Sequence, residues 1–191
     1  MYTPIVIVGF ALLFACLLRA VVEPRVVSRG SMKPTLHPGD RILAFKTRGS
    51  LFPVKAGDIV VLREPTLSRT STPRASTVNN PESSSLTVCS LLHRRKSRPR
   101  DLIKRVVAKG HDTVFIARGV VFVNGLPSPW VGKNAPHLTF GPYKVPEDSL
   151  FVLGEDLAIS RDSRDFGPVV KSLLVGKVFA VYWPARRIRL L

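Results

Sequence analysis

Hydrophobic and polar positions divide the chain into three parts: an apolar beginning, a series of short alternating segments, and a polar stretch that interrupts them. Residues 2–22 contain a single charged side chain, Arg19. About 20 apolar residues are enough for a helix to cross a hydrocarbon core of about 30 Å. A cleaved signal peptide usually begins with a basic side chain, and residues 1–4 have none. We therefore expect a retained transmembrane helix over residues 2–22.

Short apolar runs separated by turn residues follow this predicted helix. Alternation within the runs, and the Gly, Pro, Asn and Asp residues between them, are typical of strands. Residues 113–125 have the pattern of a hairpin that ends in Asn124-Gly125. Residues 126–143 are rich in proline, and we expect them to be irregular. The chain is therefore predicted to be mainly β, with strands over residues 25–27, 41–45, 58–62, 101–108, 113–116, 119–123 and 176–184.

The polar stretch covers residues 65–100 and is dominated by Ser, Thr, Pro, Asn and Arg. Such a segment buries too little apolar surface to offset the entropy lost on ordering, so we expect a disordered insert. It contains seven basic residues and one acidic residue, Glu82, and so carries +6 of the formal net charge of +16. More than a third of the net charge therefore lies outside the predicted fold.

The formal net charge of +16 points to an anionic partner, either nucleic acid or a membrane surface. No nucleic-acid-binding motif with interleaved aromatic residues is present in the sequence, so a lipid bilayer is expected and nucleic acid is not. Cys16 lies in the apolar beginning and Cys89 in the polar insert. Their positions predict neither a disulfide nor a metal site.

Ser31 is the candidate nucleophile. It follows Gly30, whose small backbone lets a substrate carbonyl approach, and precedes a proline-containing turn. A serine hydroxyl is a weak nucleophile until a base adjoins it. His111 and His137 have no acid at a spacing that suggests a catalytic triad, so we do not expect either to be that base.

Lys104 lies inside the apolar run 101–108, which alone would fit a lysine at a strand edge that points to solvent. Taken together with the segment around Ser31, it is the candidate base. Alternation along a strand places Leu102 and Lys104 on one face. Lysine is seldom fully buried without a partner, and burial disfavours its ammonium form. A neutral lysine can accept the proton of a serine hydroxyl.

A third polar segment, residues 154–168, contains the spaced pattern Ser160, Asp162, Ser163, Arg164. Together with the segments around Ser31 and Lys104, it resembles the conserved boxes of the type I signal peptidases, membrane-anchored serine proteases with a Ser–Lys dyad. The resemblance implies a signal-peptidase-type β-sheet domain over residues 24–191 behind one N-terminal transmembrane helix, with no metal and no other cofactor. It also implies that the enzyme removes signal peptides from preproteins after small residues at −1 and −3.

The resemblance further implies a role for each candidate residue. Ser31 would be the nucleophile and Lys104 the general base. Ser160 would orient the lysine amine, supported by an ion pair between Asp162 and Arg164. The substrate pockets would be formed by Met32, Leu36, Leu102 and Ile103.

Three positions depart from the family pattern: Gly110-His111-Asp112 replaces Pro-Gly-Asp, Glu155-Asp156 replaces Asp-Asn, and Arg29 replaces a serine that often completes the oxyanion hole. Ser28 is one residue away and would face the other way in an extended strand. These departures leave open a catalytically impaired paralogue that acts as a binding or regulatory subunit of a membrane peptidase. A self-cleaving repressor would need a DNA-binding N-terminus instead of the apolar one, and a membrane-tethered nucleic-acid binder would need a binding motif.

The resemblance implies a single-pass protein of the mitochondrial inner membrane or the thylakoid membrane, with the bacterial plasma membrane as the alternative, and it leaves open a second peptidase subunit. Arg19, Arg25 and Arg29 all follow the apolar segment. The positive-inside rule would keep that side in the cytoplasm or matrix. The resemblance implies the opposite orientation, and the sequence leaves both open.

Overall fold

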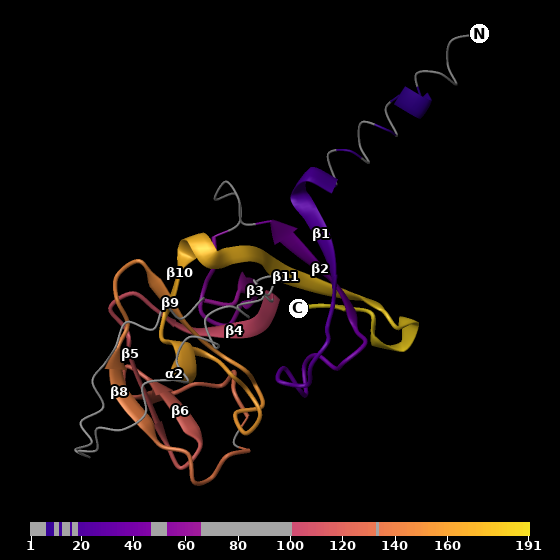
Figure 1. The fold of residues 1–191 in the computed structure, drawn as a ribbon. Helices are drawn as coiled ribbons and strands as arrows, with labels where there is room; N and C mark the ends of the chain where they lie inside the picture. The colour runs from indigo at the N-terminus through magenta and orange to yellow at the C-terminus, as the bar shows by residue number, and fades with distance from the viewer. Residues whose placement is uncertain are drawn as a thin grey trace, which may run out of the picture.

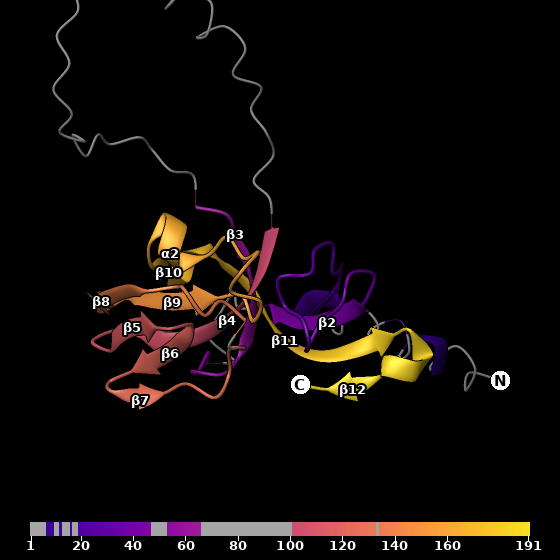
Figure 2. The same ribbon diagram turned by 90° about the horizontal axis from the view of Figure 1, so that it is seen from below.

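The computed structural model describes residues 7–9, 12, 16, 19–46, 53–65, 101–132 and 134–191. Its strands form two antiparallel sheets, which lie side by side in Figures 1 and 2. The prediction of a mainly β fold is confirmed. Residues 66–100, almost all of the predicted insert, lie outside the described residues, as does Cys89.

The larger sheet has eight strands in the order β1-β2-β11-β3-β4-β9-β10, with β12 paired to β11. Its middle strands are apolar on both faces, which fits a sheet that is covered on both sides. The strands are β1 (Val22–Val26), β2 (Arg41–Lys46), β3 (Ile59–Arg63), β4 (Asp101–Lys109), β9 (Ser149–Leu153), β10 (Val169–Val170), β11 (Leu174–Trp183) and β12 (Arg189–Leu190).

The smaller sheet has the order β7-β6-β5-β8. Its strands are β5 (Thr113–Ala117), β6 (Val120–Val123), β7 (Leu126–Pro127) and β8 (Phe140–Lys144). The predicted hairpin of β5 and β6 is confirmed, and Asn124 and Gly125 turn the chain from β6 into β7 with φ values of 51° and 83°. Asn and Gly tolerate this left-handed conformation better than other residues.

The prediction that residues 126–143 are irregular is wrong at both ends, because β7 and most of β8 fall in this range. β8 pairs with β5 through a register shift and contains Pro142. It is an edge strand of the smaller sheet, where a residue without an N–H can be tolerated. Because proline is rare inside strands, the sequence pattern did not predict β8.

Short helical segments connect the later strands. They are α2 (Ser163–Phe166), the 3₁₀ turn η1 (Lys171–Leu173) and the 3₁₀ turn η2 (Ala185–Arg187). The Asp162 carboxylate caps α2 by accepting a hydrogen bond from the backbone N–H of Arg164. The helix therefore begins at the polar segment that sequence analysis singled out.

The apolar core is divided into three clusters around the central strands β3 and β4. One packs the loop after β1 against β2 and β11, through buried side chains that include Met32, Leu36 and Ile42. A second joins β9 to the smaller sheet around Phe151. The third lies around Val60, Val106 and Val152. β4 contributes side chains to more than one cluster, and its middle is therefore held from both faces.

Most of the predicted transmembrane segment, residues 2–22, lies outside the described residues. Residues 7–9, 12, 16 and 19–21 are helical, and β1 begins at Val22. Among the residues that the structure describes, no helix has both the length and the apolar character needed to span a membrane.

Candidate active site

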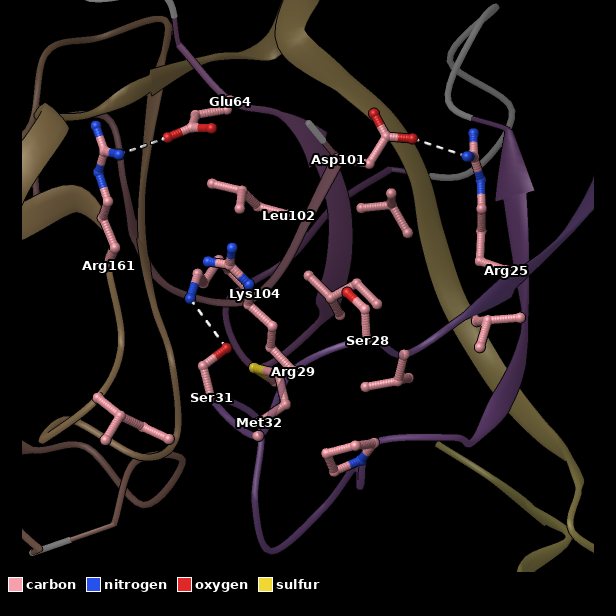
Figure 3. Close-up of a pocket in the computed structure, with 17 residues that line it drawn as sticks. Arg25, Ser28, Arg29, Ser31, Met32, Glu64, Asp101, Leu102, Lys104 and Arg161 are labelled. Carbon is pink, nitrogen blue, oxygen red and sulfur yellow. Dashed lines mark hydrogen bonds and ion pairs between the residues drawn. The ribbon is translucent and has the colours of Figure 1, made fainter. Parts of the chain in front are cut away.

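Ser31 and Lys104 line one pocket and contact each other there (Figure 3), and Ser160 contacts the same Lys104 amine. The Lys104 amine Nζ lies 3.1 Å from Ser31 Oγ and 2.8 Å from Ser160 Oγ. Ser31 comes from the loop after β1, Lys104 from β4, and Ser160 from the loop before α2. Three segments far apart in the sequence thus place two hydroxyl groups around one amine.

Lys104 reaches the pocket from inside the sheet, where β4 pairs it with Val60 of β3. The side chains of Leu102 and Val106 leave β4 on the same face and pack in one apolar cluster. Lys104 is only 3% exposed. Burial lowers the pKa of Lys104 from 10.5 to about 8, because a charged amine loses solvation there.

Nearby charges modify this effect in both directions. Asp162 raises the pKa of Lys104, whereas Arg164 and Arg29 lower it. Among the described residues, no carboxylate lies within ion-pair distance of the Lys104 amine. Within the described part of the chain, the amine therefore has two hydroxyl neighbours and no counter-ion in contact.

Ser160 is fixed by Gly154 and by the start of α2. The backbone N–H of Gly154 donates to Ser160 Oγ over 3.1 Å and to Asp162 Oδ2 over 3.1 Å. A Cβ atom at Gly154 would lie 2.3 Å from Ser160 Oγ and 2.7 Å from the Ser31 carbonyl oxygen. Only glycine fits between the two serines.

Asp162 and Arg164 form an ion pair behind Ser160, with 2.8 Å between Arg164 Nε and Asp162 Oδ1. Asp162 is fully buried. Arg164 Nη2 also donates to the carbonyl oxygens of Ser160, over 2.9 Å, and Leu157, over 3.0 Å. These bonds fix the backbone on both sides of the serine that contacts Lys104.

The pocket has a volume of about 620 Å³. Of the four residues predicted to bind substrate, Met32, Leu102 and Ile103 line it. Leu36 does not line it; its side chain is fully buried in the core cluster with Met32 and Ile42. Neither His111 nor His137 lines the pocket.

Arg105 and Glu155 form a second charged group beside the site, which sequence analysis did not identify as functional. Glu155 Oε1 lies 2.9 Å from Arg105 Nε, and Glu155 Oε2 accepts a 3.1 Å hydrogen bond from the backbone N–H of Thr35. Arg105 also donates to the Gly57 carbonyl oxygen, and its guanidinium carbon lies 5.9 Å from the ring centre of Trp130. In the sequence, the only sign of this charged group was that Glu155-Asp156 replaces the Asp-Asn of the family pattern.

Arg29 lines the pocket and is exposed. Its position in the sequence, two residues before Ser31, is the one at which the family often has a serine. Among the residues described, no three His, Cys, Asp or Glu side chains form a group that could hold a metal ion. At the contact between Ser31 and Lys104 the chemistry is thus that of hydroxyl groups and one amine, while three arginines (Arg25, Arg29, Arg161) and two acidic residues (Glu64, Asp101) also line the pocket.

A serine hydroxyl in contact with a buried lysine, in a mainly β fold, is the arrangement of a serine hydrolase that uses lysine in place of histidine. Comparison with known proteins specifies the class further. Residues 2–183 match the family described as "Signal peptidase, peptidase S26", and the chain belongs to this family. It is a serine endopeptidase.

Curated relatives come from bacteria and from a plant. "Signal peptidase I" of Leptolyngbya laminosa is 30% identical over 95% of this chain and 79% of that protein. "Signal peptidase I T" of Bacillus subtilis is 30% identical over 94% of this chain and 83% of that protein. "Thylakoidal processing peptidase 1, chloroplastic" of Arabidopsis thaliana is 29% identical over 88% of this chain and 44% of that protein.

Proposed function

We propose that this protein is a membrane-anchored endopeptidase that removes N-terminal signal peptides from preproteins, with Ser31 as nucleophile and Lys104 as general base. The observation that carries the proposal is the 3.1 Å contact between the buried Lys104 amine and Ser31 Oγ. The names of the relatives support the choice of signal peptides as substrates.

In the first step, Ser31 Oγ attacks the scissile carbonyl while the neutral Lys104 amine takes the hydroxyl proton. With a pKa of about 8, roughly one-tenth of Lys104 is neutral at pH 7. The resulting ammonium then gives its proton to the leaving amine, which departs as the new N-terminus. An acyl-enzyme on Ser31 remains.

In the second step, Lys104 takes a proton from water, and the hydroxide attacks the acyl carbonyl. The ammonium returns its proton to Ser31 Oγ as the signal peptide leaves. Ser160 keeps the amine directed at Ser31, and the Asp162–Arg164 pair keeps Ser160 in place. The backbone N–H of Ser31 is the first donor to the oxyanion that forms in each step.

The strand pairing supports binding of an extended substrate. β9 pairs with residues 105–109 of β4. Within the described part of the chain, residues 101–104 of β4 pair with a strand on one side alone, namely β3. β1 is an edge strand, and Val26 and Val27 also line the pocket. An extended peptide can add to such edges, with alternate side chains entering the pocket. Met32, Leu102 and Ile103 would then limit the −1 and −3 positions to small residues.

A membrane location is supported by the apolar sequence of residues 2–22 and by exposed apolar side chains near β1 and β12. Val26 is 61%, Trp183 53%, Ile188 63% and Leu190 82% exposed. These belong to the half of the larger sheet that contains β1, β2, β11 and β12 (Figure 2). Relatives from bacteria and a chloroplast favour a bacterial plasma membrane or a thylakoid membrane.

The test is cleavage of a preprotein with an Ala-x-Ala site by the purified full chain in detergent, with the cut located by mass spectrometry. We expect a single cut after the second alanine, lost in Ser31→Ala. Ser172→Ala is the matched control, because Ser172 is exposed in η1, away from the pocket. A wild-type chain that binds the preprotein and leaves it intact would overturn the proposal in favour of a binding subunit.

A further inference from the structure

The loop that carries Ser31 is held from two sides. On the inner side, the backbone N–H of Asp156 donates to the Ser31 carbonyl oxygen over 3.1 Å, and Glu155 accepts from the Thr35 N–H. We call residues 29–40 the serine loop. Its inner contacts come from the segment that follows β9, which also fixes Ser160.

The outer side of the serine loop is held by Arg187 and Arg189. We call residues 184–191, the segment that contains them, the arginine strap. Arg187 Nη2 lies 3.0 Å from Asp40 Oδ2 and 3.5 Å from the Thr35 carbonyl oxygen. Arg189 Nη2 donates to the same Thr35 oxygen. Arg187 and Arg189 therefore both contact the Thr35 carbonyl oxygen, and Arg187 also contacts Asp40.

Asp40 is a buried carboxylate, 2% exposed, at the end of the serine loop. It also accepts a 2.8 Å hydrogen bond from the backbone N–H of His37. A buried carboxylate needs a cationic partner, and removal of that partner leaves an uncompensated charge. Arg187 is the partner recorded for Asp40 among the described residues.

The strap itself has a fixed backbone. β12 pairs with β11, with Ala180 opposite Leu190 and Val181 opposite Arg189 (Figure 2). The N–H of Leu191 donates to the Phe179 carbonyl oxygen over 2.9 Å. The guanidinium groups therefore project from a backbone that is tied to the larger sheet. The family match ends at residue 183, so it does not include the strap.

Thr35 is linked to Ser31 by a tight turn. The N–H of Leu36 donates to the Met32 carbonyl oxygen over 2.7 Å, and the N–H of Lys33 donates to that of Gly30 over 3.0 Å. Met32 and Leu36 are buried on one face of this turn. A displacement at Thr35 is therefore transmitted to Ser31 one turn away.

We propose that Arg187 and Arg189 are positioning residues, which hold the serine loop so that Ser31 Oγ stays within reach of Lys104. The inference rests on the proposed function, because it assigns these residues to the geometry of the Ser–Lys pair. A misplacement of about 1 Å in a catalytic group can cost about 100-fold in rate. The strap acts through the loop and does not touch the reacting atoms.

The experiment compares Arg187→Ala and Arg189→Ala with Arg186→Ala, a matched control whose side chain is exposed. We expect kcat on an Ala-x-Ala peptide to fall about 10-fold to 100-fold in the two strap variants, with KM changed less than about two-fold. Arg187→Lys keeps a cation beside Asp40 and should recover part of the lost kcat. Asp40→Asn should reduce the effect of Arg187→Ala, because the two residues act as a pair.

A second readout is the rate at which a fluorophosphonate probe labels Ser31 in each variant. It should fall in parallel with kcat, and it does not depend on the identity of the natural substrate, so it tests the strap even if preproteins are not cleaved. Labelling and kcat equal to those of Arg186→Ala would overturn the proposal. So would a lower Tm with unchanged kcat, or an unchanged kcat with a raised KM. If Arg187→Ala does not fold, Arg187→Lys and Arg189→Ala are each compared with Arg186→Ala in its place. Values of kcat and labelling equal to those of Arg186→Ala in both variants would then overturn the proposal.

Discussion

Two adjacent cationic side chains on β4, Lys104 and Arg105, are both largely buried but have different neighbours. Lys104 and Arg105 leave the strand in opposite directions. On the Lys104 side lie two hydroxyl groups and apolar residues, and burial lowers the pKa of the amine to about 8. On the Arg105 side lies the Glu155 carboxylate, 2.9 Å from Arg105 Nε.

The difference lies in the partner that each buried cation contacts: hydroxyl groups at Lys104 and a carboxylate at Arg105. A carboxylate in contact stabilises the charged form, whereas at Lys104 the more distant Asp162 offsets only part of the cost of burial. The guanidinium is also charged at all physiological pH values, whereas an ammonium can lose its proton. The Lys104 side is therefore suited to proton transfer and the Arg105 side to holding the serine loop.

Replacing Lys104 by a side chain with a permanent charge should have the largest effect on activity. Lys104→Arg cannot accept a proton near neutral pH, so we expect kcat/KM to fall by about 10²-fold to 10⁴-fold. The measurement is steady-state cleavage of an Ala-x-Ala peptide, with Lys144→Arg, at an exposed position on β8, as control. Activity within tenfold of wild type would exclude Lys104 as the base.

Removing the charge on the Arg105 side should mainly reduce stability. Glu155 is 3% exposed and Arg105 13%, so Glu155→Gln leaves a nearly buried guanidinium without its counter-ion. Loss of one partner of such a pair costs about 3–5 kcal/mol. Urea unfolding measures this cost, and Glu147→Gln, which is 80% exposed, is the matched control. Equal stability of the two variants would show that Arg105 needs no partner.

Lys104→Met should stabilise the protein although it abolishes activity. The folded-state pKa of about 8 lies below the unfolded value of 10.5, so at pH 7 both states hold the proton and the folded state bears the cost of a buried charge. Methionine removes this cost, and the gain at pH 7 is at most about 3 kcal/mol. The gain should decline as pH rises from about 8 to 10.5. Urea unfolding at pH 7 and pH 10 tests both statements, and an equal gain at both would contradict them.

Arg29→Gln should have the smallest effect. Because Arg29 lowers the pKa of Lys104, its removal should move the rise of kcat/KM with pH to higher pH. Activity at pH 7 should fall about two-fold. The pH profile of the variant checks this, with Arg186→Gln as control. A loss of about 10²-fold or more at every pH would contradict a purely electrostatic role and would identify the guanidinium as an oxyanion donor.

Much of the site could be predicted because its signals are local. The alternating run around Lys104 predicts a strand, and its combination with the segment around Ser31 favoured a buried amine; the structure has both. The Asp162–Arg164 pair spans two residues of one turn, so its spacing was visible in the sequence.

The contacts that the sequence could not predict join distant segments. Glu155 and Thr35 are 120 residues apart, and Arg189 and Thr35 are 154 apart. No local pattern reports such a pairing, because it depends on how the segments after β9 and after β11 fold against the loop between β1 and β2. Leu36 was expected to contact substrate from its motif position near the nucleophile; its side chain packs in the core beside Met32, and its part in substrate binding stays a prediction.

The central claim is that Lys104 loses its proton near neutral pH and serves as the base for Ser31. The most direct test is the pH dependence of kcat/KM for the full-length wild-type enzyme on a peptide without ionisable side chains. The structure predicts a rise with a midpoint at about pH 8, the pKa of Lys104. A rate that is independent of pH between about 6 and 10, or a midpoint near the ordinary lysine value of about 10.4, would contradict the claim.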